Sequence, residues 1–197
     1  MAGRSSTEDH VLVPAARRTA LGVASAAAIV GLTSCMSQSP GPAGDPASPA
    51  RPAAVDVGGR HPCELLDTAQ RSDLDLRDGK VDDATIGDLP APTCGYLGSD
   101  GAVDVNLQFI PVPVSRLLFD ARAVPIDVAG YRAAETVYPS DSYPSCEVGI
   151  DIDDSTSLRA QAMATSANLR RSGMADSDLC ARARAVVSAA LSSLLHR

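Results

Sequence analysis

An uncharged apolar run that stops at a cysteine limits where this chain can build a folded core. Residues 19–34 carry no charged side chain and follow two arginines, which is the layout of a secretory signal. The run has sixteen residues, whereas a membrane-spanning helix needs roughly 20. We therefore interpret it as a cleaved signal. Residues 36–59 contain five prolines and few side chains that can pack, which predicts a disordered tether.

The cysteine at the end of the apolar run carries a second signal. Leu32-Thr33-Ser34-Cys35 resembles the bacterial lipobox, in which the cysteine sulfur receives a diacylglyceryl group and the cysteine becomes the new N-terminus. Two acyl chains on one residue give stable membrane anchoring. We predict that Cys35 is the lipidation site. The alternative is an ordinary signal peptide in which this cysteine occurs by chance.

The chain thus divides into three parts. We expect a signal peptide over 1–34, a lipidated cysteine and tether over 35–59, and a single extracytoplasmic α+β domain over 60–197. The formal net charge of −7 disfavours binding to nucleic acid or to anionic head groups. The partners that we expect are the cell membrane, through the N-terminal lipid, and either an envelope protein or a small-molecule ligand.

Four further cysteines remain once Cys35 is assigned to lipid, an even number in an exported chain. Export implies an oxidising compartment, so two disulfides are expected. Four cysteines allow three pairings, and the sequence cannot choose among them. We predict Cys63–Cys94 and Cys146–Cys180, because sequential pairing closes the shorter loops. A zinc site is disfavoured, because no two of these cysteines have a CxxC-like spacing.

Two segments alternate between apolar and polar residues, which is the period of a strand with one buried face. The first, residues 102–110, follows a Gly-Ser-Asp-Gly turn, so 94–110 is predicted to form a β-hairpin. The second, residues 146–153, is followed by a turn and a partner strand over 158–164. Its inward side chains are expected to be Val148, Ile150 and Ile152. Another strand is predicted over 128–137.

An apolar stripe with a period near 3.6 predicts a long helix over 176–195. Asp176 or Ser177 is expected to cap it. Cys180 lies on the apolar side, so a disulfide to Cys146 would hold this helix against the sheet.

The remaining segments give weaker signals. Shorter helices are expected over 61–71 and 115–123, with Ser115 as the N-cap of the second. Residues 72–92 are acidic and contain two prolines, so they are expected to be mostly loop. The predicted fold is therefore α+β, with an antiparallel sheet packed by a C-terminal helix and one or two shorter helices, and with two disulfides.

Several short motifs now stand in order along the chain. They are the lipobox, the proline-rich tether, PCELL at 62–66, Cys-Gly-Tyr at 94–96, Cys-x-Val-x-Ile at 146–150 and a last helix that contains LCARA. This order resembles the cell-envelope lipoproteins of high-GC Gram-positive bacteria grouped as domain of unknown function 3558. The resemblance implies a lipid anchor, two disulfides, an α+β domain and no assigned activity.

Two departures from that family pattern affect local structure. The family has Asp before its Pro-Cys pair, whereas this chain has His61, and His is a poorer N-cap than Asp. The family often has Trp two residues after its second cysteine, where Tyr96 stands here.

Candidate catalytic residues are few. His61 and Cys63 suggest a Cys–His nucleophile, but an exported cysteine in an even set favours a disulfide. The other histidines are His10, within the signal, and His196, next to the last residue, and there is no G-x-S-x-G motif. We predict no catalytic residue.

Candidate metal ligands are also few. Asp151, Asp153 and Asp154 suggest a Ca²⁺ loop, but the glycine and the glutamate that an EF-hand needs are missing. We expect Asp151 and Asp153 to lie on the solvent face at the end of a hairpin. We therefore predict no metal site and no cofactor.

Two tyrosines, Tyr138 and Tyr143, lie in a Pro/Ser-rich segment where no core is expected. Exposed loop tyrosines often make binding contacts, whereas the simpler interpretation is that their rings cover the core beside Cys146. The function that we expect is a non-catalytic ligand-binding or protein-interaction module at the cell envelope. The alternatives are a carboxylate-based envelope hydrolase and a purely structural lipoprotein.

Overall fold

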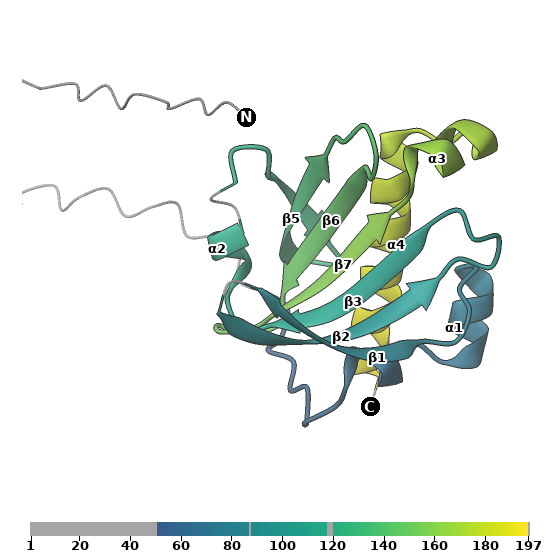
Figure 1. Cartoon of the computed structure of the whole chain (residues 1–197). Coiled ribbons are helices and arrows are strands. Elements are labelled where there is room, and N and C mark those ends of the chain that lie inside the picture. Colours follow the sequence, from purple (N-terminus) through teal and green to yellow (C-terminus); the bar gives the residue numbers. More distant parts are fainter. Residues whose placement is uncertain (1–50, 87, 118–119, 197) are drawn as a thin grey trace, which may run out of the picture. The chain divides into compact units, whose positions relative to one another are not determined.

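Residues 51–86, 88–117 and 120–196 are described by the computed structural model. The predicted signal peptide, Cys35 and the tether up to residue 50 lie outside the described residues. Seven strands form one antiparallel sheet in the order β1-β2-β3-β7-β6-β5-β4 (Figure 1). The strands are β1 (Lys80–Ile86), β2 (Leu89–Leu97), β3 (Asp104–Ile110), β4 (Val124–Val128), β5 (Tyr131–Tyr138), β6 (Ser145–Asp151) and β7 (Ser157–Met163).

Five helices, four short and one long, accompany the sheet in the described residues. They are the 3₁₀-helix η1 (Pro62–Glu64), α1 (Thr68–Asp73), α2 (Val114–Leu117), α3 (Ser166–Ser172) and α4 (Asp176–Leu195). The antiparallel sheet, the long C-terminal helix and the shorter helices confirm the predicted fold class.

Helix α4 covers one face of the sheet, where it lies across β6 and β7. The contact is formed by the apolar stripe of the helix and by the inward-facing residues of the alternating strands. The buried residues of α4 are Leu179, Cys180, Ala183, Val186, Val187, Ala190, Leu191 and Leu194. The sheet offers Val148, Ile150, Leu158, Ala160 and Ala162. The many alanines let the helix backbone approach the sheet closely, which suits a chain without Trp.

The bounds of α4 match the prediction, but its cap does not. The N-cap is Ala175, whose backbone N–H donates to Asp178 Oδ2 at 2.7 Å. Asp176 and Ser177 lie inside the first turn. The carboxylate of Asp178, three residues after the N-cap, thus accepts from the backbone N–H of the N-cap residue, whereas no side chain of the N-cap accepts from the first turn.

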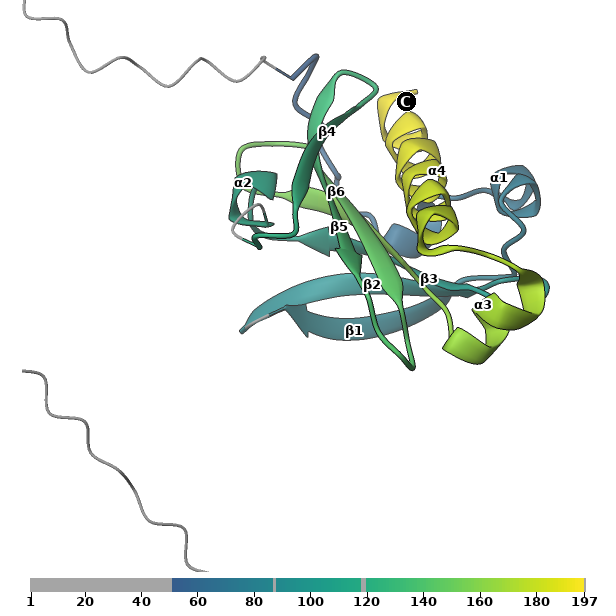
Figure 2. The same ribbon diagram turned by 90° about the horizontal axis from the view of Figure 1, so that it is seen from above.

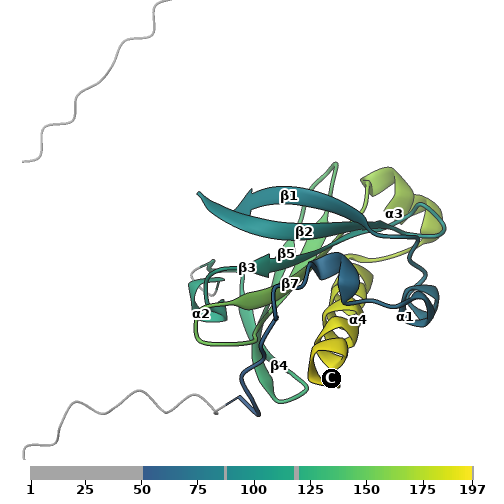
Figure 3. The ribbon, with the colours of Figure 1, turned by 90° about the horizontal axis from the view of Figure 1, so that it is seen from below.

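Two disulfides join the helices to the sheet. Cys146 of β6 is bonded to Cys180 in the second turn of α4, and Cys63 of η1 is bonded to Cys94 of β2, with Cα atoms 5.0 Å apart in each pair. These are the sequential pairs expected from the loop lengths. Helix α1 lies beside α4 (Figure 3), where Gln70 Nε2 donates to Ser193 Oγ at 2.9 Å.

The folded part begins earlier than the predicted boundary at residue 60. Val55 is buried, and its backbone N–H donates to the carbonyl oxygen of Ile152 at 2.8 Å. The assignment of residues 51–59 to a disordered tether is therefore wrong. The proline-rich composition of this segment suggested disorder, but the segment also contains two apolar residues, Val55 and Val57, that pack against the core.

Residues 72–92 were predicted to be mostly loop, and this is also wrong, because they contain all of β1 and the first four residues of β2. Prolines are tolerated here for a reason of register. Pairing of β2 with β3 begins at Thr93, so Pro90 and Pro92 pair with the edge strand β1 alone. A missing backbone N–H costs little on the side that has no neighbouring strand.

Three smaller expectations also change. The helix expected over 61–71 is divided into η1 and α1, because Asp67 and Gln70 form a capping box that starts α1. The strand expected over 128–137 is confirmed as β5 from Tyr131 onward, whereas Val128 ends β4, and Ala129 and Gly130, which both have positive φ, form the two-residue turn between the two strands. The helix expected over 115–123 is limited to the four residues of α2.

His61 performs the capping role that its chemistry had put in doubt. It is the N-cap of η1, and its Nδ1 accepts a hydrogen bond from the backbone N–H of Cys63 at 3.2 Å. Its Nε2 is buried without a partner among the described residues. An imidazole thus replaces the carboxylate as acceptor, but leaves one ring nitrogen unsatisfied.

Removal of the Cys146–Cys180 disulfide is expected to lower the free energy of unfolding by roughly 3–4 kcal/mol, because the bond closes a long loop in the unfolded chain. Denaturant unfolding of a Cys146→Ala/Cys180→Ala double variant measures this loss. Wild-type protein treated with reductant serves as the comparison. An unchanged unfolding midpoint would contradict the role given to this bond.

His61→Asp is expected to raise the free energy of unfolding by about 0.5–1 kcal/mol, because Asp is a stronger N-cap and removes the unsatisfied ring nitrogen. His61→Ala is the matched control and is expected to lower it by about 1 kcal/mol. Both are measured by chemical denaturation. The interpretation fails if the Asp variant is less stable than the Ala variant.

Candidate functional site

The face of the sheet opposite α4, which we call the outer face, is built from the alternate residues of each strand. Helix α2 lies on this side, and α4 lies on the other side of β5 and β6 (Figure 2). The backbone N–H of Val114 in α2 donates to the carboxylate of Asp151, and Ser157 Oγ donates to the carbonyl oxygen of Val112 at 2.6 Å. Residues 112–114 therefore lie over one end of the outer face.

A polar network runs across the middle of the outer face. Its members are Thr93, Gln108, Arg159, Glu147 and Gln161. Gln108 Nε2 donates to Thr93 Oγ1 at 2.9 Å, and Arg159 Nε donates to Gln108 Oε1 at 2.9 Å. Glu147 accepts from Arg159 Nη1 at 3.1 Å and from Gln161 Nε2 at 3.0 Å.

This outer-face network is largely withdrawn from solvent. The side chains of Arg159 and Glu147 are 13% and 16% exposed. A charge pair at this depth is stabilising only when its remaining hydrogen-bonding groups are satisfied, and the two glutamines satisfy them. The network therefore fixes the orientation of the polar side chains on this face.

Beside the network lies a half-enclosed cavity of about 470 Å³, which we call the Gly95 hollow. It extends over β1, β2, β3 and the end of β7. Gly95 pairs with Lys80 on one side and with Asn106 on the other. The lining also includes Asp82, Leu97, Asp104 and Met163. Gln161 and Glu147 continue the same row of the sheet, so the hollow adjoins the network.

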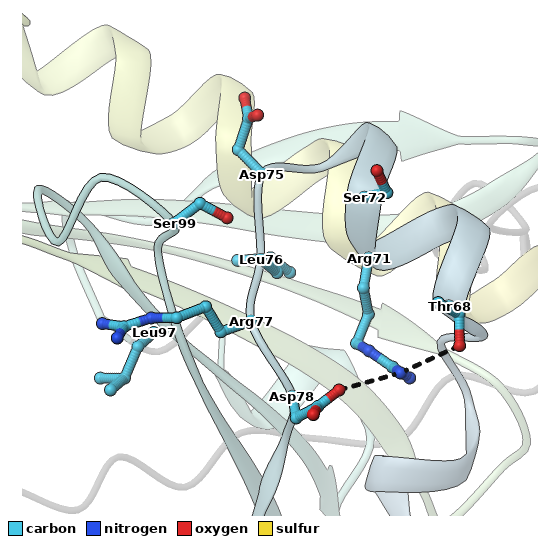
Figure 4. A pocket seen from close by; sticks show the side chains of 9 residues that line it. All are labelled: Thr68, Arg71, Ser72, Asp75, Leu76, Arg77, Asp78, Leu97 and Ser99. Carbon is cyan, nitrogen blue, oxygen red and sulfur yellow. Dashed lines mark hydrogen bonds and ion pairs between the residues drawn. The ribbon is translucent and has the colours of Figure 1, made fainter.

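A second, wider cavity of about 720 Å³ lies between α1 and the segment that leads into β1, and we call it the Arg71 depression (Figure 4). Leu76 and Leu97 give it an apolar part, and hydroxyl groups of Ser72 and Ser99 line it. It shares Asp78 and Leu97 with the Gly95 hollow. The two cavities therefore adjoin along these two residues.

Arg71 is held in place by three acceptors. Its Nη1 donates to the carbonyl oxygen of Leu66 at 2.7 Å, and its Nη2 donates to Thr68 Oγ1 and Asp78 Oδ1, each at 3.2 Å. The dashed lines in Figure 4 show the last two bonds. The Asp78 carboxylate is 96% exposed, so this ion pair contributes little to stability. Burial raises the pKa of the nearby Tyr96 to about 12, and the positive charge of Arg71 opposes that rise.

The two tyrosines singled out in the sequence have different surroundings. Tyr138 is not in a loop: it is the last residue of β5, where the guanidinium carbon of Arg122 lies 4.4 Å from its ring centroid. Tyr143 lies in the following loop and is 66% exposed. Its ring does not cover the core, so the simpler interpretation is wrong for Tyr143. The loop backbone is held by Ser140 Oγ, which accepts from the N–H of Tyr143 at 3.1 Å.

The aspartates near the end of β6 also have separate roles. Asp151, which was expected on the solvent face, is buried, and its Oδ2 accepts from Arg132 Nε at 2.9 Å. That expectation is wrong because α2 and its flanking residues cover this part of the outer face. Asp153 closes the β6–β7 turn by accepting from the backbone N–H of Thr156 at 2.7 Å. Asp154 is paired with Arg51.

One group of potential metal ligands gathers in the described residues, namely Glu135, Cys146 and Cys180. The two sulfurs are bonded to each other, and the carboxylate accepts from Arg184 Nη2 at 2.7 Å. This group therefore offers no thiolate to a metal. Cys63 is likewise bonded to Cys94, so the Cys–His nucleophile considered for residues 61 and 63 is not formed.

Comparison with known proteins adds the family. A family model described as "Protein of unknown function (DUF3558)" matches residues 30–193. The chain belongs to this family. No curated protein and no solved structure matches it. Within the described residues, no helix has both the length and the apolar character needed to cross a bilayer.

Neither cavity and no part of the outer-face network was predicted from the sequence. The polar residues of the alternating strands were interpreted as a solvated face, and a glycine between a cysteine and a tyrosine gave no reason for attention. The available signal was the position of Gly95 inside a segment that pairs on both sides, which becomes visible only after β1 is recognised as a strand.

The carboxyl group of Asp120 is expected to titrate near pH 2. Hydrogen bonds from the side chain and the backbone of Arg122 lower its pKa from 3.8 to about 2. A lowered pKa in the folded state means that this contribution to stability is present above the ordinary pKa and is lost as the pH falls toward 2. NMR titration of the carboxyl carbon measures the midpoint.

Arg122→Ala is expected to return the Asp120 midpoint toward the ordinary value. Tyr138→Phe is the control and is expected to change the midpoint least, because the hydrogen bond from Tyr138 is the smallest of the effects that lower the pKa of Asp120. A wild-type midpoint close to 3.8 would contradict the pairing.

Proposed function

We propose that the mature protein is a non-catalytic, ligand-binding lipoprotein on the extracytoplasmic face of the cell membrane. The proposed anchor is Cys35, which stands where the apolar run ends and the proline-rich segment begins. The two disulfides support export, because such bonds persist in oxidising compartments. Membership of the DUF3558 family is consistent with this proposal but assigns no activity.

The observation that carries the binding role is the pair of adjoining cavities. Their volumes of about 720 and 470 Å³ fall within the range of roughly 300–1,000 Å³ typical of small-molecule sites. The Gly95 hollow combines the apolar side chains of Leu97 and Met163 with charged and polar groups, whereas the Arg71 depression is lined mainly by polar side chains. Polar groups beside apolar surface can fix the orientation of a ligand.

The contents of the cavities favour binding over chemistry. The titratable side chains that project into them are those of Asp, Arg and Lys, with Tyr96 facing the core, and neither lining includes a histidine. A carboxylate-based hydrolase would need two carboxyl groups that converge on one bond. The Asp78 carboxylate, which the two cavities share, is instead bound to Arg71. Asp82 and Asp104 lie on β1 and β3, on either side of β2, and pair with Thr93 and Leu97, so their carboxylates do not converge on one bond.

Full-length protein expressed in an actinobacterial host tests the proposal in two steps. Cys35→Ser is expected to abolish incorporation of a labelled fatty acid and to move the protein out of the membrane fraction, because the thiol is the acyl acceptor. Native mass spectrometry of the wild-type protein, released from membranes in a non-ionic detergent, is expected to show a retained small-molecule adduct. Unchanged fractionation of the serine variant would refute the anchor, and the absence of any adduct would count against the binding role.

A further inference from the structure

We propose that the Gly95 hollow binds a positively charged group, a primary ammonium or a guanidinium, carried on an aliphatic chain. This inference rests on the proposed function and specifies the class of ligand. It is carried by three features of the hollow: a mid-strand glycine, two unpaired carboxylates and two flanking apolar side chains.

Gly95 is not required by the backbone of β2. It lies in the interior of the strand, its pairing to β1 and β3 continues without a bulge, and its φ is not positive. A Cβ atom at this position would lie 3.5 Å from Asn106 Oδ1 and 3.9 Å from the carbonyl oxygen of Lys80, which are ordinary contacts. The fold therefore has room for a side chain here.

A glycine inside a strand weakens the strand and often marks a bulge, a bend, or a place where a ligand or another backbone approaches closely. The continuous register excludes a bulge, and no protein backbone crowds the position. The missing side chain instead forms the floor of the hollow, with the amide of Asn106 beside it. Because the space over Gly95 is open and forms part of the hollow, we assign to it the approach of a ligand.

The charge of the lining selects a cation. Asp82 and Asp104 contribute carboxylates from β1 and β3, and no ion pair or hydrogen bond to either carboxylate occurs among the described residues. Asp78 adds a third carboxylate at the edge, and Lys80 is the cation of the lining. The formal net charge of the whole chain, −7, has the same sign.

The register places one of these carboxylates between two apolar side chains. Asp104 pairs with Leu97 of β2 on one side and with Met163 of β7 on the other, so the three side chains share a row of the outer face. Leu97 is 49% exposed. An aliphatic chain can therefore lie along Leu97 and Met163 while the charge that it carries meets Asp104.

The test uses full-length, isotopically labelled protein in non-ionic detergent micelles. Butylammonium chloride, sodium butyrate and 1-butanol are the probes, because they share a four-carbon chain and differ in charge. We expect butylammonium alone to shift the backbone amide signals of Gly95, Asp104 and Asn106 in a saturable manner. Asp104→Asn is expected to raise the apparent Kd roughly fivefold, as the loss of one partly exposed charge pair implies.

Two substitutions sharpen the result. Gly95→Leu fills the hollow and is expected to abolish the shifts, whereas Gly95→Ala is the conservative comparison and keeps most of the cavity. Asp141→Asn removes the same charge from an exposed loop residue outside the hollow and is expected to leave the Kd unchanged. If Gly95→Leu does not fold, Asp104→Asn and Asp141→Asn decide the matter.

The outcomes separate this inference from the proposed function. Equal shifts with butanol, or stronger shifts with butyrate at residues of the Arg71 depression, would overturn the cation site while retaining a binding role. An identical Kd for Asp104→Asn and wild type would also overturn it. Failure of all three probes, together with the absence of a native adduct, would refute both proposals.

Discussion

The packing of α4 against β6 and β7 is the contact on which the rest of the structure depends. It buries the whole apolar stripe of the helix, and the Cys146–Cys180 bond fixes the position of the helix on the strand. Two of the four tyrosines, Tyr96 and Tyr131, are fully buried, and the chain has no Trp. With few large aromatic side chains, the core relies on aliphatic residues, on close approach through alanines and on two covalent links.

The opposite face of the sheet has no long helix over it. Because α4 covers only one face, the side chains of the outer face must either be compatible with water or be covered by other segments. The segment around α2 covers one end of it, and the network around Arg159 satisfies the polar groups of the middle. The other end, over β1 and β2, retains the Gly95 hollow. The candidate site thus lies on the part of the sheet that neither α4 nor α2 covers.

Sequence periodicity identified the elements that are buried on one face and exposed on the other. The hairpin of β2 and β3, the β6–β7 pair and α4 were all predictable, because their apolar residues recur at two or near 3.6 positions. The edge strand β1 was not predictable, because residues such as Asp82 and Asp83 are exposed on both faces and leave no alternation. The two prolines of β2 were taken as loop signals, and only the register shows that they meet no strand on one side.

The candidate site was less accessible to sequence reasoning than the fold. The cysteines could be assigned to disulfides from their number, and the structure pairs them in sequential order. Asp151 was misjudged because its burial depends on α2, which is distant in sequence. The role of Gly95 depends on pairing with both β1 and β3, so no local pattern around Cys-Gly-Tyr could reveal it.

Native-state hydrogen exchange tests most directly the claim that α4 and the central strands form one cooperative unit. Buried amides of α4, β6 and β7 are expected to share the highest opening free energy, close to that of global unfolding, whereas amides of the edge strand β1 are expected to open at a lower free energy. Exchange of α4 through a separate, lower-energy opening, while β6 and β7 remain protected, would contradict this claim.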